Sequence, residues 1–234
     1  MKDRELLKSP GIMGGDGAAA DVLRGEYDLK NMQLFCNEAE IDICFFGDSI
    51  TNLMEPSAYY KQFGSCINRG ISGDSIHIMN RRFEADVLQL KPRVCVILGG
   101  INNTWCLDPF VGEDGSVPSE KVKEVYDLVE NSYIEILKAA SAVGQKMVVC
   151  SVLPVREPIQ FADMRNKVVL GLNKIIKRLC DEYQTPYVDY HSRLVCDDGM
   201  TLREGLSDDG LHPHFKGYIE MADVLTPVLK EILK

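Results

Sequence analysis

Residues 41–51 read IDICFFGDSIT, and this stretch decides how the chain folds. Its first six residues are rich in Ile, Cys and Phe, which is typical of a strand buried on both faces of a sheet. Gly47-Asp48-Ser49 ends the apolar run and predicts a turn from strand to helix. In a parallel sheet, such a turn places the hydroxyl of Ser49 at the carboxyl edge of the strands, where this kind of fold binds its ligands.

Four further apolar runs predict four more strands, at residues 66–68, 94–98, 146–152 and 186–189. Between and after these runs, the spacing of apolar residues predicts three helices. The first covers residues 119–143, with Ser119 as N-cap and Gly144 as stop, and the second follows Asp163. The third begins at Phe215, and Pro227 is expected to kink or divide it. Strands that alternate with helices predict a doubly wound α/β domain, in which helices cover both faces of a parallel sheet.

Composition narrows the classes of protein to which the chain can belong. Its 234 residues, 45% of them apolar, suit a single domain, with residues 1–40 expected as a loop and a helix around 21–38 packed on the main part at 41–234. Acidic residues outnumber basic ones by 35 to 26 with no basic stripe, which argues against a nucleic-acid partner. No segment has the apolar length of a membrane span or a secretory signal, so we expect a cytoplasmic protein. Eight scattered cysteines without a C-x-x-C pair argue against a zinc site or a disulfide framework.

One histidine stands out as a partner for Ser49. A serine hydroxyl needs a base within hydrogen-bond reach, and that base needs a third group to orient it. His212, one of four histidines, follows a carboxylate, Asp209, by three residues in a loop-like setting, where Gly210 allows the turn to fold back. Two simpler readings stay open, because Asp-Ser also suits a helix cap and the Asp209 segment also suits a polar loop before the last helix.

Candidate donors for a negatively charged oxygen follow two other strands. Residues 99–103 read GGINN, where Asn102 offers an uncharged amide, and residues 70–75 read GISGDS, where Gly73 allows a backbone N–H to face a ligand. Either segment alone is typical of an ordinary turn. The predicted fold gathers both at the same sheet edge as Ser49, which favours an oxyanion hole there.

Together these motifs resemble the four sequence blocks of the SGNH hydrolases, also called GDSL lipases or esterases. The resemblance runs from about residue 33 to the C-terminus and rests on Gly47-Asp48-Ser49, Gly73, Gly100-x-Asn102 and Asp209-x-x-His212. It implies a three-layer α/β/α flavodoxin-like domain with a five-stranded parallel sheet, and ester hydrolysis through an acyl-enzyme that needs neither a metal nor an organic cofactor.

The resemblance also implies a role for each residue. Ser49 is the nucleophile and first oxyanion donor, Gly73 and Asn102 are the other donors, His212 is the general base, and Asp209 orients the base. Many members have Asp after the third-block Asn, where this chain has Asn103.

Residues 68–75 look closest to the branch that contains the platelet-activating-factor acetylhydrolase catalytic subunits. This branch favours short acyl groups such as acetyl, and related bacterial proteins deacetylate carbohydrates. The expected partner is therefore a small-molecule ester, either an acetylated carbohydrate or a short-chain lipid ester.

Two side chains near these motifs are candidate substrate contacts. Trp105 follows the third block and Arg156 follows the fourth strand, although a core or lid anchor and a surface salt bridge are the respective alternatives. For the whole protein, a non-catalytic binding module of the same fold and a metal-dependent phosphoesterase remain alternatives. An ordinary α/β-hydrolase would need G-x-S-x-G and a nicotinamide dehydrogenase G-x-G-x-x-G, which the first strand lacks.

Overall fold

A five-stranded, all-parallel sheet forms the centre of the protein in the computed structural model, which describes residues 2–11 and 19–234. The strand order is β2-β1-β3-β4-β5. The strands are Ile43–Gly47 (β1), Cys66–Gly70 (β2), Val94–Leu98 (β3), Met147–Cys150 (β4) and Tyr187–Val188 (β5). Each predicted apolar run overlaps one of them, so the predicted doubly wound α/β fold is confirmed, with strand ends that differ by at most two residues.

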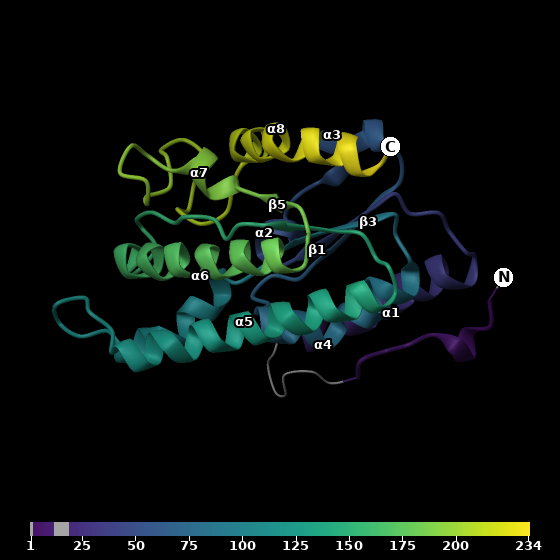
Figure 1. The fold of residues 1–234 in the computed structure, drawn as a ribbon, viewed down its shortest axis with the longest axis horizontal. Coiled ribbons are helices and arrows are strands. Elements are labelled where there is room, and N and C mark those ends of the chain that lie inside the picture. Colours follow the sequence, from purple (N-terminus) through teal and green to yellow (C-terminus); the bar gives the residue numbers. More distant parts are fainter. Residues whose placement is uncertain (1, 12–18) are drawn as a thin grey trace.

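Helices cover both faces of the sheet and make three layers (Figure 1). One layer holds α1 (Ala19–Cys36), α4 (Ile76–Asp86), α5 (Ser119–Ala142) and α6 (Ala162–Glu182), and the other holds α3 (Pro56–Tyr60), α7 (Tyr190–Leu194) and α8 (Phe215–Ile232). The short α2 (Ser49–Asn52) follows β1, and 3-10 turns cover Arg4–Leu6 (η1), Lys61–Phe63 (η2), Leu88–Leu90 (η3) and Ile101–Phe110 (η4). Among the described residues, no helix combines the length and the apolar character that a bilayer crossing needs.

Two details of the predicted helices are wrong. Ser119 is the first residue of α5 rather than its N-cap, which is Pro118, while Gly144 ends that helix region at φ +70° as expected. Pro227 does not divide the last helix, because α8 continues through it, while the alternative of a kink at Pro227 stays a prediction. Proline removes only one backbone donor from a helix, and the buried Met221, Leu225 and Leu229 on either side hold α8 against the core.

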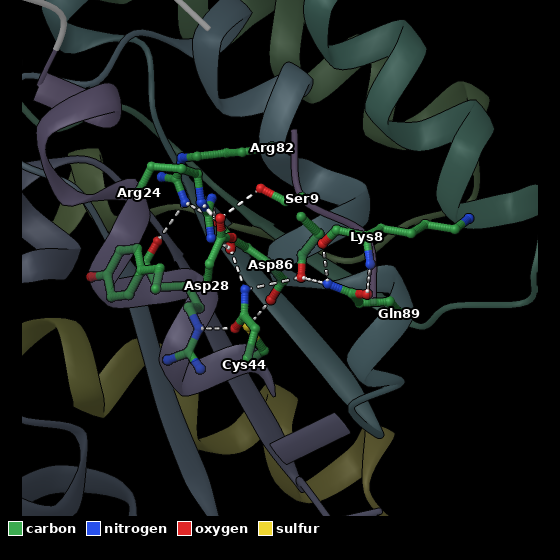
Figure 2. A network of polar contacts seen from close by, with 12 residues as sticks. Lys8, Ser9, Arg24, Asp28, Cys44, Arg82, Asp86 and Gln89 are labelled. Atoms are coloured by element: carbon green, nitrogen blue, oxygen red, sulfur yellow. Dashed lines mark hydrogen bonds and ion pairs between the residues drawn. The ribbon is translucent and has the colours of Figure 1, made fainter. Parts of the chain in front are cut away.

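The N-terminal helix packs on α4 rather than standing apart. The side chain of Tyr27 packs against Ile71, and its hydroxyl donates to the carbonyl oxygen of Gly70. Arg24 makes a bidentate pair with Asp86, at 3.0 and 2.7 Å, in the interior shown in Figure 2. The helix occupies Ala19–Cys36 instead of 21–38, and part of the expected loop, residues 12–18, lies outside the described residues. These contacts support our proposal that the first 40 residues belong to the same domain.

The carboxyl ends of three neighbouring strands lie at one level of the sheet. Gly47 at the end of β1 is in register with Gly70 of β2 and Leu98 of β3. The N–H of Ile71 donates to the carbonyl oxygen of Gly47 over 2.9 Å, so the segments after β1 and β2 stay joined beyond the strands. Every residue of β1 and β3 is buried, which fixes this edge rigidly to the core.

Candidate active site

Ser49 begins α2 directly after β1. The preceding Asp48 is the N-cap of this turn, and its Oδ1 accepts a hydrogen bond from the N–H of Ile50 at 3.0 Å. Asp48 is fully buried, and its Oδ2 has no hydrogen-bond partner among the described residues. Burial raises the pKa of the Asp48 carboxyl to about 7, even though the Ile50 bond acts in the opposite direction. The helix-capping role considered for Gly-Asp-Ser is therefore performed by Asp48, which leaves the Ser49 hydroxyl for another partner.

Asp209 organises the loop before α8 through both oxygens of its carboxylate. Oδ1 accepts hydrogen bonds from the N–H groups of Leu211 (2.9 Å) and His212 (2.8 Å) and from the hydroxyl of Ser207 (3.0 Å). Oδ2 lies 2.5 Å from Nδ1 of the His212 ring. Burial raises the pKa of Asp209, but the bonds from the His212 ring and from these N–H groups outweigh it and hold the pKa well below its usual range.

His212 connects this loop to the segment after β1. Its Nε2 lies 2.9 Å from Oγ of Ser49, 163 residues away in sequence. Ser49 is buried, whereas the side chains of His212 and Asp209 are partly open to solvent at 28% and 52% exposure. The structure thus joins Ser49, His212 and Asp209 in one continuous hydrogen-bonded chain at the edge of the sheet.

The two predicted oxyanion segments meet at Asp74. The N–H of Asp74 donates to the carbonyl oxygen of Ile71 over 3.1 Å and closes a turn in which Gly73 has φ +79°, a backbone angle that favours glycine. The carbonyl oxygen of Asp74 accepts a hydrogen bond from Nδ2 of Asn102 at 2.9 Å. This bond uses one of the two amide protons of Asn102 and leaves the other for a ligand.

Asn103 performs a structural task that its sequence position did not reveal. It is buried, and its Oδ1 accepts a hydrogen bond from the N–H of Ile76 at 3.1 Å, at the start of α4. An amide oxygen and a carboxylate oxygen both accept such a bond, so Asn at this position can do what an Asp would do there.

Trp105 is held in place by a buried arginine. The guanidinium carbon of Arg165 lies 3.6 Å from the centre of the Trp105 ring. Nη2 of Arg165 is 2.6 and 2.7 Å from the two carboxylate oxygens of Asp108, and Nη1 donates to the hydroxyl of Thr104 at 3.1 Å. One face of the indole is therefore occupied by a protein side chain, and its role as a substrate contact stays a prediction.

Arg156 lies at the margin of a polar surface cavity. The cavity measures about 650 Å³, and Arg156, Gln160 and Thr201 are among its lining residues. Within residues 2–11 and 19–234, no ion pair of Arg156 is found. Its role as a substrate contact also stays a prediction.

Two buried charged residues near the site were missed by sequence reasoning, namely Arg82 and the side chain of Asp74. They form an ion pair of 2.7 Å that is closed to solvent. Only the position of Asp74 next to Gly73 offered any signal, since an isolated arginine in a charged segment reads as a surface residue. In the part of the chain that the structure describes, no group of three or more His, Cys, Asp or Glu is arranged to hold a metal ion.

Comparison with known proteins identifies one family and several curated relatives, two of which follow. The GDSL-like lipase/acylhydrolase family matches residues 45–218. An acetylxylan esterase of Xylanibacter ruminicola is 24% identical over 181 residues, covering 74% of this chain and 36% of that protein. The alpha2 subunit of platelet-activating factor acetylhydrolase IB from Homo sapiens is 34% identical over 74 residues, covering 30% of this chain and 32% of that subunit. The chain thus aligns with about a third of the length of each of these two relatives.

A solved structure has the same fold. The crystal structure of a GDSL-like lipase from Bacteroides thetaiotaomicron gives a TM-score of 0.72 at 24% identity and covers 88% of this chain and 97% of that one. The predicted resemblance is confirmed, since the family match covers most of the chain and includes the segments of Ser49, Asn102 and His212. The chain belongs to the GDSL-like lipase/acylhydrolase family.

Proposed function

We propose that this chain hydrolyses carboxylic esters with short acyl groups, in particular acetyl esters, through an acyl-enzyme on Ser49. The observation that carries the proposal is the hydrogen-bonded chain from Ser49 Oγ to His212 Nε2 (2.9 Å) and from His212 Nδ1 to Asp209 Oδ2 (2.5 Å). These distances are those needed by a nucleophile, its base and the group that orients the base.

In the proposed reaction, His212 carries its proton on Nδ1, toward Asp209, and presents Nε2 to the Ser49 hydroxyl. As Oγ attacks the ester carbonyl carbon, Nε2 takes the hydroxyl proton and later gives it to the departing alcohol. Asp209 stabilises the resulting imidazolium, and its low pKa keeps it ionised throughout the neutral range. A water molecule, deprotonated by the same Nε2, then releases the acid from Ser49.

The negative oxygen of the tetrahedral intermediate needs donors that are in place before the reaction. We assign these to the N–H groups of Ser49 and Gly73 and to the free amide proton of Asn102. The turn at Gly73 and the bond from Asn102 to Asp74 support this assignment, because they bring two of the three donor segments together.

The relatives support acetyl as the acyl group and leave two classes of alcohol. One relative is an acetylxylan esterase, which acts on an acetylated carbohydrate. The other is a subunit of platelet-activating factor acetylhydrolase. For this chain we propose a small ester of either class. Trp105 and Arg156 are the side chains that we propose for contact with the substrate, Arg156 through the polar cavity that it lines.

Hydrolysis of p-nitrophenyl acetate by the wild type and Ser49→Ala, each with and without EDTA, tests this function. We expect wild-type activity that survives EDTA and falls by a factor on the order of 10⁶ in Ser49→Ala, as in comparable triads. Activity that EDTA abolishes would favour the metal-dependent alternative. Ser49→Ala with wild-type activity would exclude Ser49 as nucleophile.

A covalent probe separates a catalytic protein from a binding module of the same fold. A fluorophosphonate reacts preferentially with an activated serine, so intact-mass measurement should show one adduct on the wild type and none on Ser49→Ala. A folded wild type that neither reacts with the probe nor hydrolyses acetyl, butyryl or acetylated-sugar esters would favour the non-catalytic module.

A further inference from the structure

Arg82 on α4 is completely buried, and each nitrogen of its guanidinium group donates a hydrogen bond. Nε donates to Oδ2 of Asp74 at 2.7 Å, and Nη1 donates to Oδ2 of Asp86 at 2.9 Å. Nη2 donates to the carbonyl oxygen of Gly47 at 2.9 Å, and Nη1 also donates to that of Arg69 at 3.0 Å. One side chain therefore binds two carboxylates and two backbone carbonyls.

The two backbone carbonyls belong to the ends of neighbouring strands. Gly47 is the last residue of β1 and stands two residues before Ser49, while Arg69 lies in β2, four residues before Gly73. Arg82 thus fixes the strand ends from which two of the proposed oxyanion donors project. A planar guanidinium with several donors in a fixed geometry suits this task better than a flexible ammonium group.

Asp74 extends this connection to the third donor. Its carboxylate accepts from Arg82, its N–H closes the turn that holds Gly73, and its carbonyl oxygen accepts from Asn102. Three different groups of one residue therefore contact the buried arginine, the Gly73 turn and the Asn102 amide. The side chain of Asp74 is buried as deeply as that of Arg82, at 1% and 0% exposure.

The energetics of such a pair favour a geometric role over a purely stabilising one. Removing two charges from water costs about as much as their attraction returns, and apolar residues often replace a buried pair without loss of stability. An oxyanion donor, in contrast, must lie within a few tenths of an ångström of its place, and a misplacement of about 1 Å can cost roughly 10²-fold in rate.

We propose that Arg82 and Asp74 are positioning residues that hold the three oxyanion donors of Ser49, Gly73 and Asn102 in one arrangement. This inference rests on the proposed function. According to this proposal, a buried ion pair that touches no substrate controls the rate of the chemical step.

The isosteric Asp74→Asn is the main test, with Arg82→Lys as a second variant. We expect kcat for p-nitrophenyl acetate to fall roughly 10- to 100-fold, while KM changes less than about 3-fold, because the donors act on the transition state rather than on the bound ester. Asp74→Asn loosens the donor that Asn102→Ala removes, so the double variant should lose clearly less than the product of the two single losses. Independent, multiplying effects would overturn the proposal.

Arg24→Lys is the matched control, because Arg24 pairs with Asp86 in the same buried cluster without contacting a donor segment. Arg24→Lys should lower Tm while kcat stays unchanged. If it lowers kcat as much as Asp74→Asn does, the role of the cluster is merely structural and the inference is overturned.

An unchanged kcat in folded Asp74→Asn would also overturn the inference. This result is sufficient even if Arg82→Lys does not fold. Ser49→Ala in the same assay distinguishes a failure of the proposed function from a failure of the positioning role. If Ser49→Ala is inactive while Asp74→Asn is fully active, only the positioning role fails.

Discussion

The N–H of Arg156 donates a hydrogen bond of 2.9 Å to the carbonyl oxygen of Gly210, and this bond joins the segment after β4 to the turn between Asp209 and His212. The two backbones approach so closely that a Cβ at position 210 would lie 2.3 Å from the carbonyl oxygen of Arg156. Gly210 also has φ +84°. The orientation of His212 toward Ser49 therefore depends on the absence of a side chain two residues earlier.

Gly210→Ala should reduce activity strongly. The new methyl group must displace either backbone, and a shift of about 1 Å in the His212 ring can cost roughly 10²-fold in kcat/KM. Gly205→Ala is the matched control, because Gly205 has a similar φ of +73° and open space around the position of a Cβ. It carries the same backbone strain without the overlap and should retain nearly full kcat/KM. Equal losses in the two variants would contradict this explanation.

Asp209→Asn should lower kcat by about 10⁴, as the equivalent change does in a serine protease triad. The amide can still accept the N–H bonds of Leu211 and His212, but its NH₂ group would face Nδ1 and favour the tautomer whose proton blocks Nε2. The neighbouring Asp208 is exposed, and Asp208→Asn should leave kcat unchanged. Steady-state rates of both variants with an acetyl ester check this, and a fully active Asp209→Asn would remove Asp209 from the mechanism.

Asn102→Ala and Asn103→Ala should separate catalysis from stability in adjacent residues. Loss of one oxyanion donor typically costs 10²- to 10³-fold, roughly, in kcat, so Asn102→Ala should be impaired but measurable. Asn103 is not an oxyanion donor in the proposed mechanism, so Asn103→Ala should change kcat little. Its Oδ1 accepts a hydrogen bond from the N–H of Ile76, and losing this bond should lower the unfolding free energy by about 0.5–2 kcal/mol. Chemical denaturation and steady-state kinetics on both variants test the contrast, which a reversal of the two effects would contradict.

Asp48→Asn should change how stability depends on pH. Burial, and to a smaller extent the charge of Asp74, raise the pKa of the Asp48 carboxyl from 3.8 to about 7, against the opposing effects of the Ile50 bond and of Arg82. The folded protein therefore holds this proton more tightly than the unfolded chain. The contribution of Asp48 to stability is therefore fully present below pH 4 and is lost as pH rises toward 7, with a slope on the order of 1 kcal/mol per pH unit.

The amide in Asp48→Asn keeps the cap on Ile50 but does not titrate. The unfolding free energy of the variant relative to wild type should therefore rise between pH 4 and pH 7 and level off above that range. Urea unfolding at several pH values measures this difference. A constant difference across the range would show that Asp48 is ionised in the folded protein at all these pH values.

The parts of the fold that follow from apolar patterning were predictable. Strands β1 and β3 are buried on both faces, so their sequences ICFFG and VCVIL carry no competing signal. The spacing of Ser49 and of Asp209 and His212 indicated residues that the structure does bring together, through strand ends and through a turn closed by Asp209 itself. Their catalytic roles stay predictions.

Helix α4 was not predicted, for a physical reason. Its sequence IHIMNRRFEAD is rich in charged residues, yet Arg82 and Asp86 are completely buried, because they pair with each other and Asp86 also pairs with Arg24 of α1. A pattern method assigns such residues to the surface, since only the fold brings their partners into reach. The same long-range dependence hid the contact between Trp105 and Arg165.

Helix α1 lies before the segment shared with the family, which begins at residue 45, yet it completes the interior of that segment. Oδ1 of Asp86 receives the side-chain donors of Arg24 and Asn31, both from α1 (Figure 2 shows Arg24 against Asp86). A gene fragment cut at the family boundary would encode a chain with a buried carboxylate oxygen stripped of these two donors, which is a costly defect. The family match and the packed interior thus cover different lengths of this chain, and an expression boundary should keep α1.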